Sequence, residues 1–283
     1  MQPTMDDLST ISHEDVLAEA EKRTGRVLDR SRGHYSQYNG TAGFPTSAGT
    51  WVRLAWVRPG GFSAQSWTGL EASVAIQGVP RPDWFAGSMW HDEGRGVVWR
   101  VDEMSLATAP ALSPTGTVDR DPGLTDAWWV DLRAALGNLA RHETSRVCVQ
   151  QSHLSRRIGE VYGDQVDTTV ADWRCAHGDV GYANLTASPL TLLDWEDWGL
   201  APVGWDAACL WSASLLIPAL ATRVLNGFAD VLNTRAGQLS RLMLCANVTR
   251  AYRRTGKAGP LTGAMEAAAS ELLASLSGTS ASG

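Results

Sequence analysis

Lysine is scarce in this chain. Lys22 and Lys257 are the only lysines among its 24 basic residues, and the others are arginines. Acidic residues outnumber basic ones, which gives a formal net charge of −6 and a pI of about 5.5. Domains that bind nucleic acid usually carry a basic surface, so this balance argues against such a partner. A fixed cation anywhere in residues 27–256 has to come from a residue type other than lysine.

Closely spaced cysteines are also missing. The four cysteines lie far apart and form no C-x-x-C pair, so neither a zinc site nor a disulfide framework is indicated. His13-Glu14 and His142-Glu143 lack the second histidine of a zincin motif, and no G-x-S-x-G elbow is present. These absences argue against zinc peptidases and serine hydrolases that carry such motifs.

Long hydrophobic runs are absent too. The longest apolar stretch, residues 207–221, is broken by Ser212, Ser214 and Pro218, which favours a buried helix over a membrane span. The first fifteen residues are acidic and lack the apolar core of a secretory signal. We expect a soluble, cytoplasmic protein without a membrane partner.

The pattern of predicted elements indicates two lobes. A short helix is expected over residues 13–23. Valine- and tryptophan-rich runs follow, among them strands at 50–58, 88–90 and 97–104 and a helix at 66–76. After a loop, helices are expected at 125–142, 206–225, 238–254 and 260–276.

This order predicts an α+β fold with two lobes. We expect a helical extension over residues 1–24 and a small β-rich lobe over 25–105. A larger, mainly helical lobe follows over 106–277, with a disordered tail at 278–283. Two lobes sharing a cleft would suit the length of 283 residues.

The segment 176–198, AHGDVGYANLTASPLTLLDWEDW, carries the most definite chemistry in the chain. A type I turn over 188–191, with Pro189 second, would close a hairpin and place Asn184 opposite Trp195, next to Asp194. Amide and carboxylate oxygens in such a pair suit Mg²⁺. Asp179 enters the hairpin and is free to accept a proton from a hydroxyl. His177 is more suited to bracing the loop.

This segment, followed by PVGWDAACLW, resembles the aminoglycoside phosphotransferase and choline kinase-like family, relatives of protein kinases. The family motif is H-x-D-x-x-x-x-N followed by a strand ending in a metal-binding Asp. The resemblance implies a two-lobed kinase-like fold, with Asp179 as catalytic base and Asn184 and Asp194 as magnesium ligands. By the same resemblance, Asp206 braces the catalytic loop and ATP or GTP is the co-substrate.

The resemblance also implies a nucleotide-binding first lobe in which a cation on a strand pairs with a helical Glu. Glu71 suits the Glu, and Arg53 is the leading substitute for the missing lysine, ahead of Arg58. Glu103 and Met104, at the end of the last strand, are expected where backbone groups meet the adenine. Residues 39–50, with three glycines, are either a phosphate-covering loop or a plain loop.

Two functions follow as alternatives. The first is a small-molecule kinase that transfers the γ-phosphate of ATP or GTP to a hydroxyl of a small acceptor. The second is a catalytically weak, kinase-like nucleotide-binding or regulatory protein, which the missing lysine motivates. The sequence leaves the acceptor, the preferred nucleotide and the oligomeric state open.

Overall fold

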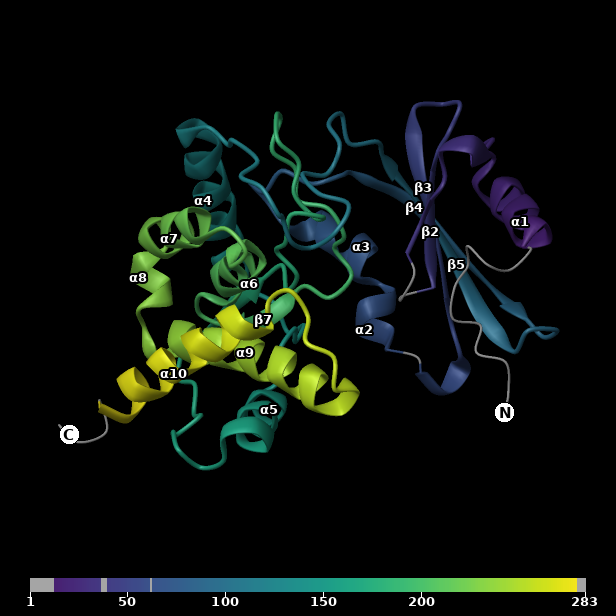
Figure 1. Cartoon of the computed structure of the whole chain (residues 1–283). Coiled ribbons are helices and arrows are strands. Elements are labelled where there is room, and N and C mark those ends of the chain that lie inside the picture. Colours follow the sequence, from purple (N-terminus) through teal and green to yellow (C-terminus); the bar gives the residue numbers. More distant parts are fainter. Residues whose placement is uncertain (1–12, 37–39, 62, 279–283) are drawn as a thin grey trace. The chain divides into compact units, whose positions relative to one another are not determined.

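The computed structural model describes residues 13–36, 40–61 and 63–278, and the chain divides into two compact units. Unit 1 comprises Met1–Ala75 and Arg81–Thr108, and unit 2 comprises Ile76–Pro80 and Ala109–Gly283. Unit 1 contains the large sheet and unit 2 most of the helices (Figure 1). The α+β class and the two-part organisation expected from the sequence are confirmed.

Unit 1 is built on an antiparallel sheet of five strands in the order β1-β2-β3-β5-β4. The strands are β1 (His34–Tyr35), β2 (Thr41–Pro45), β3 (Thr50–Val57), β4 (Trp84–Asp92) and β5 (Val97–Ser105). The strands expected at 50–58 and 97–104 are therefore confirmed. β5 pairs with β3 along its length, and Arg53 lies directly opposite Asp102.

Side-chain alternation gives the sheet two different faces. On one face, helix α1 (Glu14–Thr24) buries Val16, Leu17 and Ala20 in a core shared with Trp99 and other apolar residues of the strands. Arg100 and Asp102 occupy the alternate positions of β5, so their side chains point to the other face. The helix expected at 13–23 is confirmed, and it is part of the core of unit 1.

The helix expected over 66–76 is broken into pieces. They are α2 (Ala64–Trp67), α3 (Gly69–Ala72) and a 3-10 turn over Ser73–Ala75. Thr68 separates the first two, with φ −105° and ψ 11°. Its Oγ1 donates to the oxygen of Ala64 at 2.8 Å. A β-branched residue followed by glycine is a poor pair for continuing a helix.

The glycine-rich segment 39–50 is largely not a loop, and Asn39 lies outside the described residues. Thr41–Pro45 is strand β2, and a short turn leads into β3. Gly43 is required there, because a Cβ on it would come within 2.1 Å of the Trp51 ring. The expectation of a loop was wrong for residues 41–45, which form a strand in which Gly43 leaves room for the Trp51 ring. A phosphate-covering role for the segment stays a prediction.

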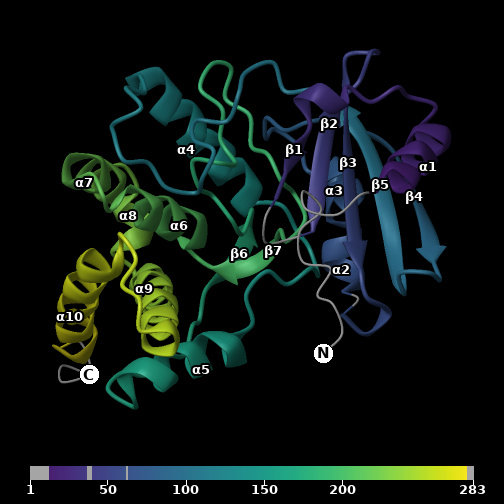
Figure 2. The same cartoon turned by 45° about the vertical axis from the view of Figure 1, so that its right-hand side comes forward.

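Unit 2 surrounds a two-stranded sheet, β6 (Trp173–Ala176) with β7 (Gly199–Pro202). Its helices are α4 (Asp126–Ala140), α5 (Gln151–Tyr162), α6 (Trp205–Ser214), α7 (Pro218–Gly227), α8 (Ala229–Leu232), α9 (Arg235–Thr255) and α10 (Thr262–Gly278). α9 packs against α5, α6 and α10 (Figure 2). The expected helices at 125–142, 238–254 and 260–276 are confirmed within a few residues.

Two helical features of unit 2 differ from expectation. The helix predicted over 206–225 is divided because Pro218 lacks the N–H that a continuing helix needs, and it begins α7 instead. The sequence analysis did not predict α5, because the apolar pattern of this segment is weak. Its buried residues, Leu154, Ile158 and Val161, stand in an otherwise polar run.

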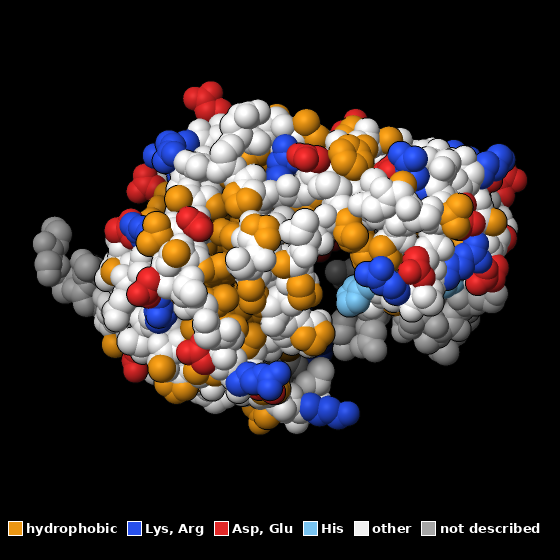
Figure 3. Space-filling model, turned by 90° about the horizontal axis from the view of Figure 1, so that it is seen from above, with side chains coloured by type: hydrophobic (Ala, Val, Ile, Leu, Met, Phe, Trp, Pro, Cys, Tyr) orange, Lys and Arg blue, Asp and Glu red, His pale blue; other side chains and the backbone are white. Residues whose placement is uncertain are grey.

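No helix within the described residues is long and apolar enough to cross a membrane. On the face shown in Figure 3, basic and acidic side chains are interspersed, and hydrophobic side chains gather over the helical unit.

Candidate active site

A buried carboxylate fixes the loop that follows β6. Asp206 stands in the first turn of α6, and its Oδ2 and Oδ1 accept the backbone N–H groups of His177 and Gly178 at 2.8 and 2.9 Å. Burial raises the pKa of Asp206, an effect opposed by His177 and by the two N–H donors. The expected bracing of this loop by Asp206 is confirmed.

His177 connects the loop to the returning chain. Its ring is buried, lies edge-on to Trp195, and its Nε2 lies 2.7 Å from the oxygen of Leu193. The backbone N–H of Asp179 points to Nδ1 at 3.4 Å. These contacts fit the tautomer with the proton on Nε2. His177 therefore braces the residues on either side of it and has no exposed ring nitrogen for chemistry.

Asp179 is held by Asn184. The Nδ2 of Asn184 donates to both the backbone oxygen and Oδ2 of Asp179, each at 2.9 Å. Asp179 remains accessible to solvent. Desolvation by the surrounding chain raises its pKa, Asp194 adds to this rise, and His177 and Asn184 oppose it. A fixed, accessible carboxylate of raised basicity can accept a proton from a hydroxyl.

The register of the hairpin that contains Asn184 and Asp194 differs from the one expected. Leu185 lies opposite Leu192, and Leu193 N donates to Asn184 O at 2.8 Å. Asn184 thus faces Leu193 instead of Trp195. The expected type I turn over 188–191 is not formed, because the loop is closed by a hydrogen bond from Thr186 N to Thr191 O at 3.1 Å. In both the expected and the observed register, the residue opposite Asp194 is a sequence neighbour of Asn184.

The orientation of Asn184 suits a metal ligand. Its NH₂ group is used by Asp179, so Oδ1 is its remaining polar atom. Asp194 is the one non-glycine residue with positive φ (60°) among the described residues, a conformation that Asp tolerates better than most. The described residues contain no cluster of three His, Cys, Asp or Glu side chains able to hold a metal. Asn184 and Asp194, the ligands expected from the sequence, could hold Mg²⁺ only with phosphate and water completing its shell.

Gly178 lies where no side chain fits. Its φ is 98°, and a Cβ would approach Cys148 Sγ to 2.7 Å. Its backbone oxygen accepts Trp205 Nε1 at 2.9 Å. Trp195, Trp198 and Trp205 are all buried in the core, and Trp205 additionally fixes the loop.

Arg146 braces the segment after Asp194 and was not singled out from the sequence. Its Nε and Nη2 donate to the backbone oxygens of Trp198 and Glu196, each at 3.0 Å, and its guanidinium lies over the Trp198 ring. A lone arginine in a loop gives no sequence signal for such a role.

Unit 1 contains a separate buried cluster around Arg100, which the sequence also did not reveal. Its Nε and Nη2 donate to both oxygens of Asp102 at 2.7 and 2.6 Å. Nη2 also reaches Glu71 Oε2 at 3.3 Å, and Trp84 Nε1 donates to Asp102. Burial lowers the pKa of Arg100, but its two carboxylate partners outweigh this and the net shift is upward. Glu71, expected to pair with a cation on β3, has Arg100 of β5 as a partner.

The other residues expected at the nucleotide lie on both faces of this sheet. Arg53 shares the Arg100 face, opposite Asp102. Glu103 lies on the α1 face, where its Oε1 accepts Arg26 Nε at 2.6 Å. Glu103 and Met104 pair with β3 and with β4, so the ladder already occupies their backbone groups. This arrangement does not favour Glu103 or Met104 as backbone contacts for adenine.

No protein-family model matches the chain, and no curated protein matches it by sequence. Solved structures do match. A thermostable mutant of aminoglycoside phosphotransferase APH(4)-Ia aligns with a TM-score of 0.59 and 9% identity, over 93% of this chain and 99% of that one. The GDP complex of wild-type aminoglycoside 2'-phosphotransferase-IIIa gives 0.56 and 12%, over 93% and 99%.

A third match is the amicoumacin kinase hAmiN in complex with AMP-PNP, Ca²⁺ and Ami. It has a TM-score of 0.52 and 12% identity, over 96% of this chain and 95% of that one. The chain therefore has the two-lobed, kinase-like fold of the aminoglycoside phosphotransferases.

Proposed function

We propose that the chain is a small-molecule kinase that transfers the γ-phosphate of ATP or GTP to a hydroxyl of a small acceptor. The kinase-like fold is the starting point of this proposal. The observation that carries the proposal is the fixed geometry of Asp179. Asn184 holds its carboxylate, and Asp206 holds the backbone of the two residues before it. Phosphoryl transfer depends mainly on positioning and charge stabilisation. The hydrogen bonds of this loop supply the positioning of Asp179.

In this proposal Asp179 is the catalytic base. The acceptor hydroxyl donates a hydrogen bond to its carboxylate, and the proton passes to that carboxylate as the oxygen attacks the γ-phosphorus. The bond from the γ-phosphorus to its bridging oxygen breaks, and the nucleoside diphosphate leaves with the electron pair of that bond. The raised pKa of Asp179, caused first by desolvation, makes it a stronger proton acceptor than an ordinary aspartate. His177 acts as a positioning residue, because both ring nitrogens point to backbone atoms.

Asn184 Oδ1 and the Asp194 carboxylate are the proposed ligands of Mg²⁺. A bound Mg²⁺ would supply positive charge that offsets the charge of the nucleotide phosphates. The orientation of the Asn184 amide supports this, because its oxygen is the atom that Asp179 does not use.

For unit 1 we propose that arginine takes the role of the missing lysine. Arg53 and Arg100 lie on one face of the sheet and flank the same carboxylate, Asp102. Arg100 is the cation bound to Glu71, and its planar guanidinium suits phosphate oxygens as well as carboxylates. Arg53 remains the proposed second cation.

The acceptor is proposed only as a class. The similar structures include complexes with kanamycin, hygromycin B and amicoumacin, all bound by those proteins. An antibiotic with hydroxyl groups is one candidate class for this chain. A choline-, sugar- or homoserine-type metabolite is another.

A catalytically weak nucleotide-binding or regulatory protein is the second candidate. The observation that favours it is the burial of Arg100. Its side chain is 4% exposed, and its guanidinium donates to both carboxylate oxygens of Asp102. An arginine held in this way has few donors left for a phosphate.

Nucleotide binding and turnover separate the two candidates. Thermal unfolding is followed during titration with Mg-ATP and with Mg-GTP, and a screen of hydroxylated acceptors then measures nucleotide consumption. The kinase proposal predicts a rise in unfolding temperature with at least one nucleotide and acceptor-dependent turnover. Binding without turnover by any acceptor, or no shift with either nucleotide over a wide concentration range, contradicts the kinase proposal and favours the second candidate.

A further inference from the structure

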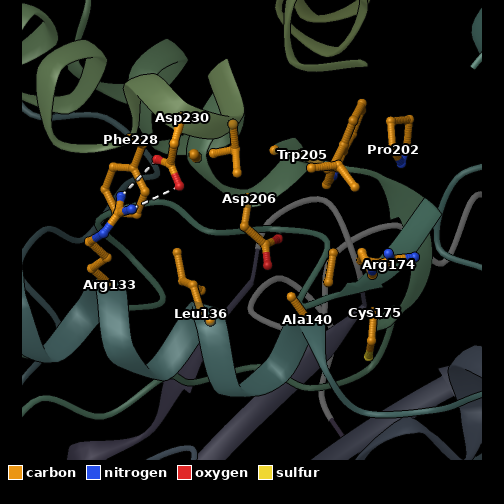
Figure 4. A pocket seen from close by; sticks show the side chains of 16 residues that line it. Arg133, Leu136, Ala140, Arg174, Cys175, Pro202, Trp205, Asp206, Phe228 and Asp230 are labelled. Carbon is orange, nitrogen blue, oxygen red and sulfur yellow. Dashed lines mark hydrogen bonds and ion pairs between the residues drawn. The ribbon is translucent and has the colours of Figure 1, made fainter. Parts of the chain in front are cut away.

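Unit 2 contains a pocket on the side of Asp206 that the proposed reaction does not use. Its volume is about 210 Å³, and it lies between α4, β6 and the start of α6. In Figure 4, Arg133, Phe228 and Asp230 stand at one end, Arg174 and Cys175 at the other, and Asp206 between them. None of the proposed catalytic or metal-binding residues lines it.

The walls of this pocket are apolar. α4 contributes Leu136, Gly137 and Ala140, which are spaced to lie on one face of the helix and are each only partly buried. The rings of Trp205 and Phe228 also line the pocket, and both residues are mostly buried in the unit. The accessible part of the α4 face is therefore an apolar wall that a small molecule can cover.

Asp206 gives the pocket its one buried charge. Each of its carboxylate oxygens accepts one backbone N–H, although a carboxylate oxygen can accept two hydrogen bonds. His177 lowers the pKa of Asp206 electrostatically, and no salt bridge to a Lys or Arg side chain is formed by Asp206 within the described residues. A buried carboxylate is costly unless a cation pairs with it, so a cation that reaches Asp206 gains a direct ion pair.

The two arginines at the rim differ in whether a carboxylate balances their charge. Arg133 is already bound to Asp230, with Nη2 and Oδ2 2.8 Å apart, and Arg174 donates to its neighbour's backbone oxygen. The acidic group is thus deep in the pocket, and the arginines are at its edges.

The volume sets the size of the ligand. A cavity of about 150 Å³ holds benzene, so about 210 Å³ accommodates one ring with a substituent of a few atoms. Sites for drug-sized molecules are larger, roughly 300 Å³ or more.

We propose that this pocket is a binding site for a small organic cation, a single apolar ring bearing an amine or amidine that pairs with Asp206. The bound cation would contact Asp206, which accepts the N–H groups of His177 and Gly178. Its binding should therefore change the environment of the loop that carries Asp179. The proposal concerns binding alone and stands whether or not the chain is a kinase.

The test uses two probes of matched shape on the full-length protein. Benzamidine is a cation, and benzamide is its neutral analogue. Calorimetric titration measures both affinities, and the amide resonance of Gly178 reports binding near Asp206. We expect benzamidine to bind at least about tenfold more tightly than benzamide and to shift the Gly178 resonance.

Two alanines of α4 give a matched pair of variants. Ala140→Phe places a ring in the pocket, whereas Ala134→Phe adds the same ring at an exposed position outside it. We expect Ala140→Phe to weaken benzamidine binding at least about tenfold and Ala134→Phe to leave it unchanged. Equal binding by wild type and Ala140→Phe, or no binding to wild type, overturns the site. Equal affinity for the two probes overturns the assignment of a cation.

Discussion

The side-chain amide of Asn184 donates two hydrogen bonds to Asp179, one to the backbone oxygen and one to Oδ2, both at 2.9 Å. One residue therefore fixes the position of the proposed base and also turns its own oxygen away from it. Because that oxygen is the proposed metal ligand, the positioning of the base and the binding of Mg²⁺ are coupled through a single amide.

Replacing Asn184 should separate these two roles. Asn184→Ala removes the tether and the ligand, whereas Asn184→Asp keeps an oxygen ligand and loses the donors. We expect both to lower kcat by about 100-fold or more, and only Asn184→Ala to weaken Mg²⁺ dependence strongly. Steady-state kinetics with varied Mg²⁺ measures this. Asn226→Ala, exposed on α7, is the control and should behave as wild type.

Asp206→Ala should destabilise unit 2. The substitution leaves the buried N–H of His177 and the N–H of Gly178 without their acceptor. We expect a loss of about 2 kcal/mol in the free energy of unfolding, because an unsatisfied buried donor costs about 1–3 kcal/mol and removal of a buried charge offsets part of the total. Urea unfolding measures the change. Asp131→Ala, exposed on α4, should be nearly neutral, and an equal loss in both variants would contradict this role.

Arg100→Met should be among the most destabilising substitutions in unit 1. It leaves the Asp102 carboxylate, 1% exposed, without its cation, and breaking a buried pair costs about 3–5 kcal/mol. The matched control is Arg133→Met, which breaks an exposed pair with Asp230 and should cost less than about 1 kcal/mol. Chemical denaturation of the two variants compares them. Similar losses would show that Asp102 does not depend on Arg100.

Asp92 should contribute stability that disappears in acid. Burial acts to raise its pKa, but hydrogen bonds from Arg95 and Trp99 outweigh it, so the pKa lies below its ordinary value of 3.8. A lowered folded pKa gives stability that is present above pH 3.8 and is lost as the pH falls through the folded pKa.

Asp92→Asn should accordingly be less stable than wild type at neutral pH, by about 1 kcal/mol. The difference should shrink below about pH 4. The free energy of unfolding as a function of pH, for both proteins, tests this. A difference that stays constant down to pH 2–3, a range that roughly spans the titration, would be the contrary result.

The sequence predicted β3, β5 and part of β4 because strand character is a local property, and the chemistry proposed for the central segment stays a prediction. The strand character of residues 50–57 is visible in their Val- and Trp-rich composition, and Asp179, Asn184 and Asp194 lie close together in the sequence. The partner of Glu71 could not be predicted in this way. It depends on the register of β5, which brings Arg100 from 29 positions further along the chain. The role of Arg146 depends in the same way on contacts to residues 50 and 52 positions away.

The most direct test of the central proposal is transfer of the γ-phosphate by wild type and Asp179→Asn to a panel of hydroxylated small molecules, with Mg-ATP and Mg-GTP. We expect wild type to phosphorylate at least one acceptor. Asp179→Asn should bind the nucleotide and unfold at the same temperature as wild type, yet transfer at least about 1,000-fold more slowly. Undiminished transfer by Asp179→Asn would contradict the role of this residue, and the absence of transfer by wild type to any acceptor would contradict the proposed kinase activity.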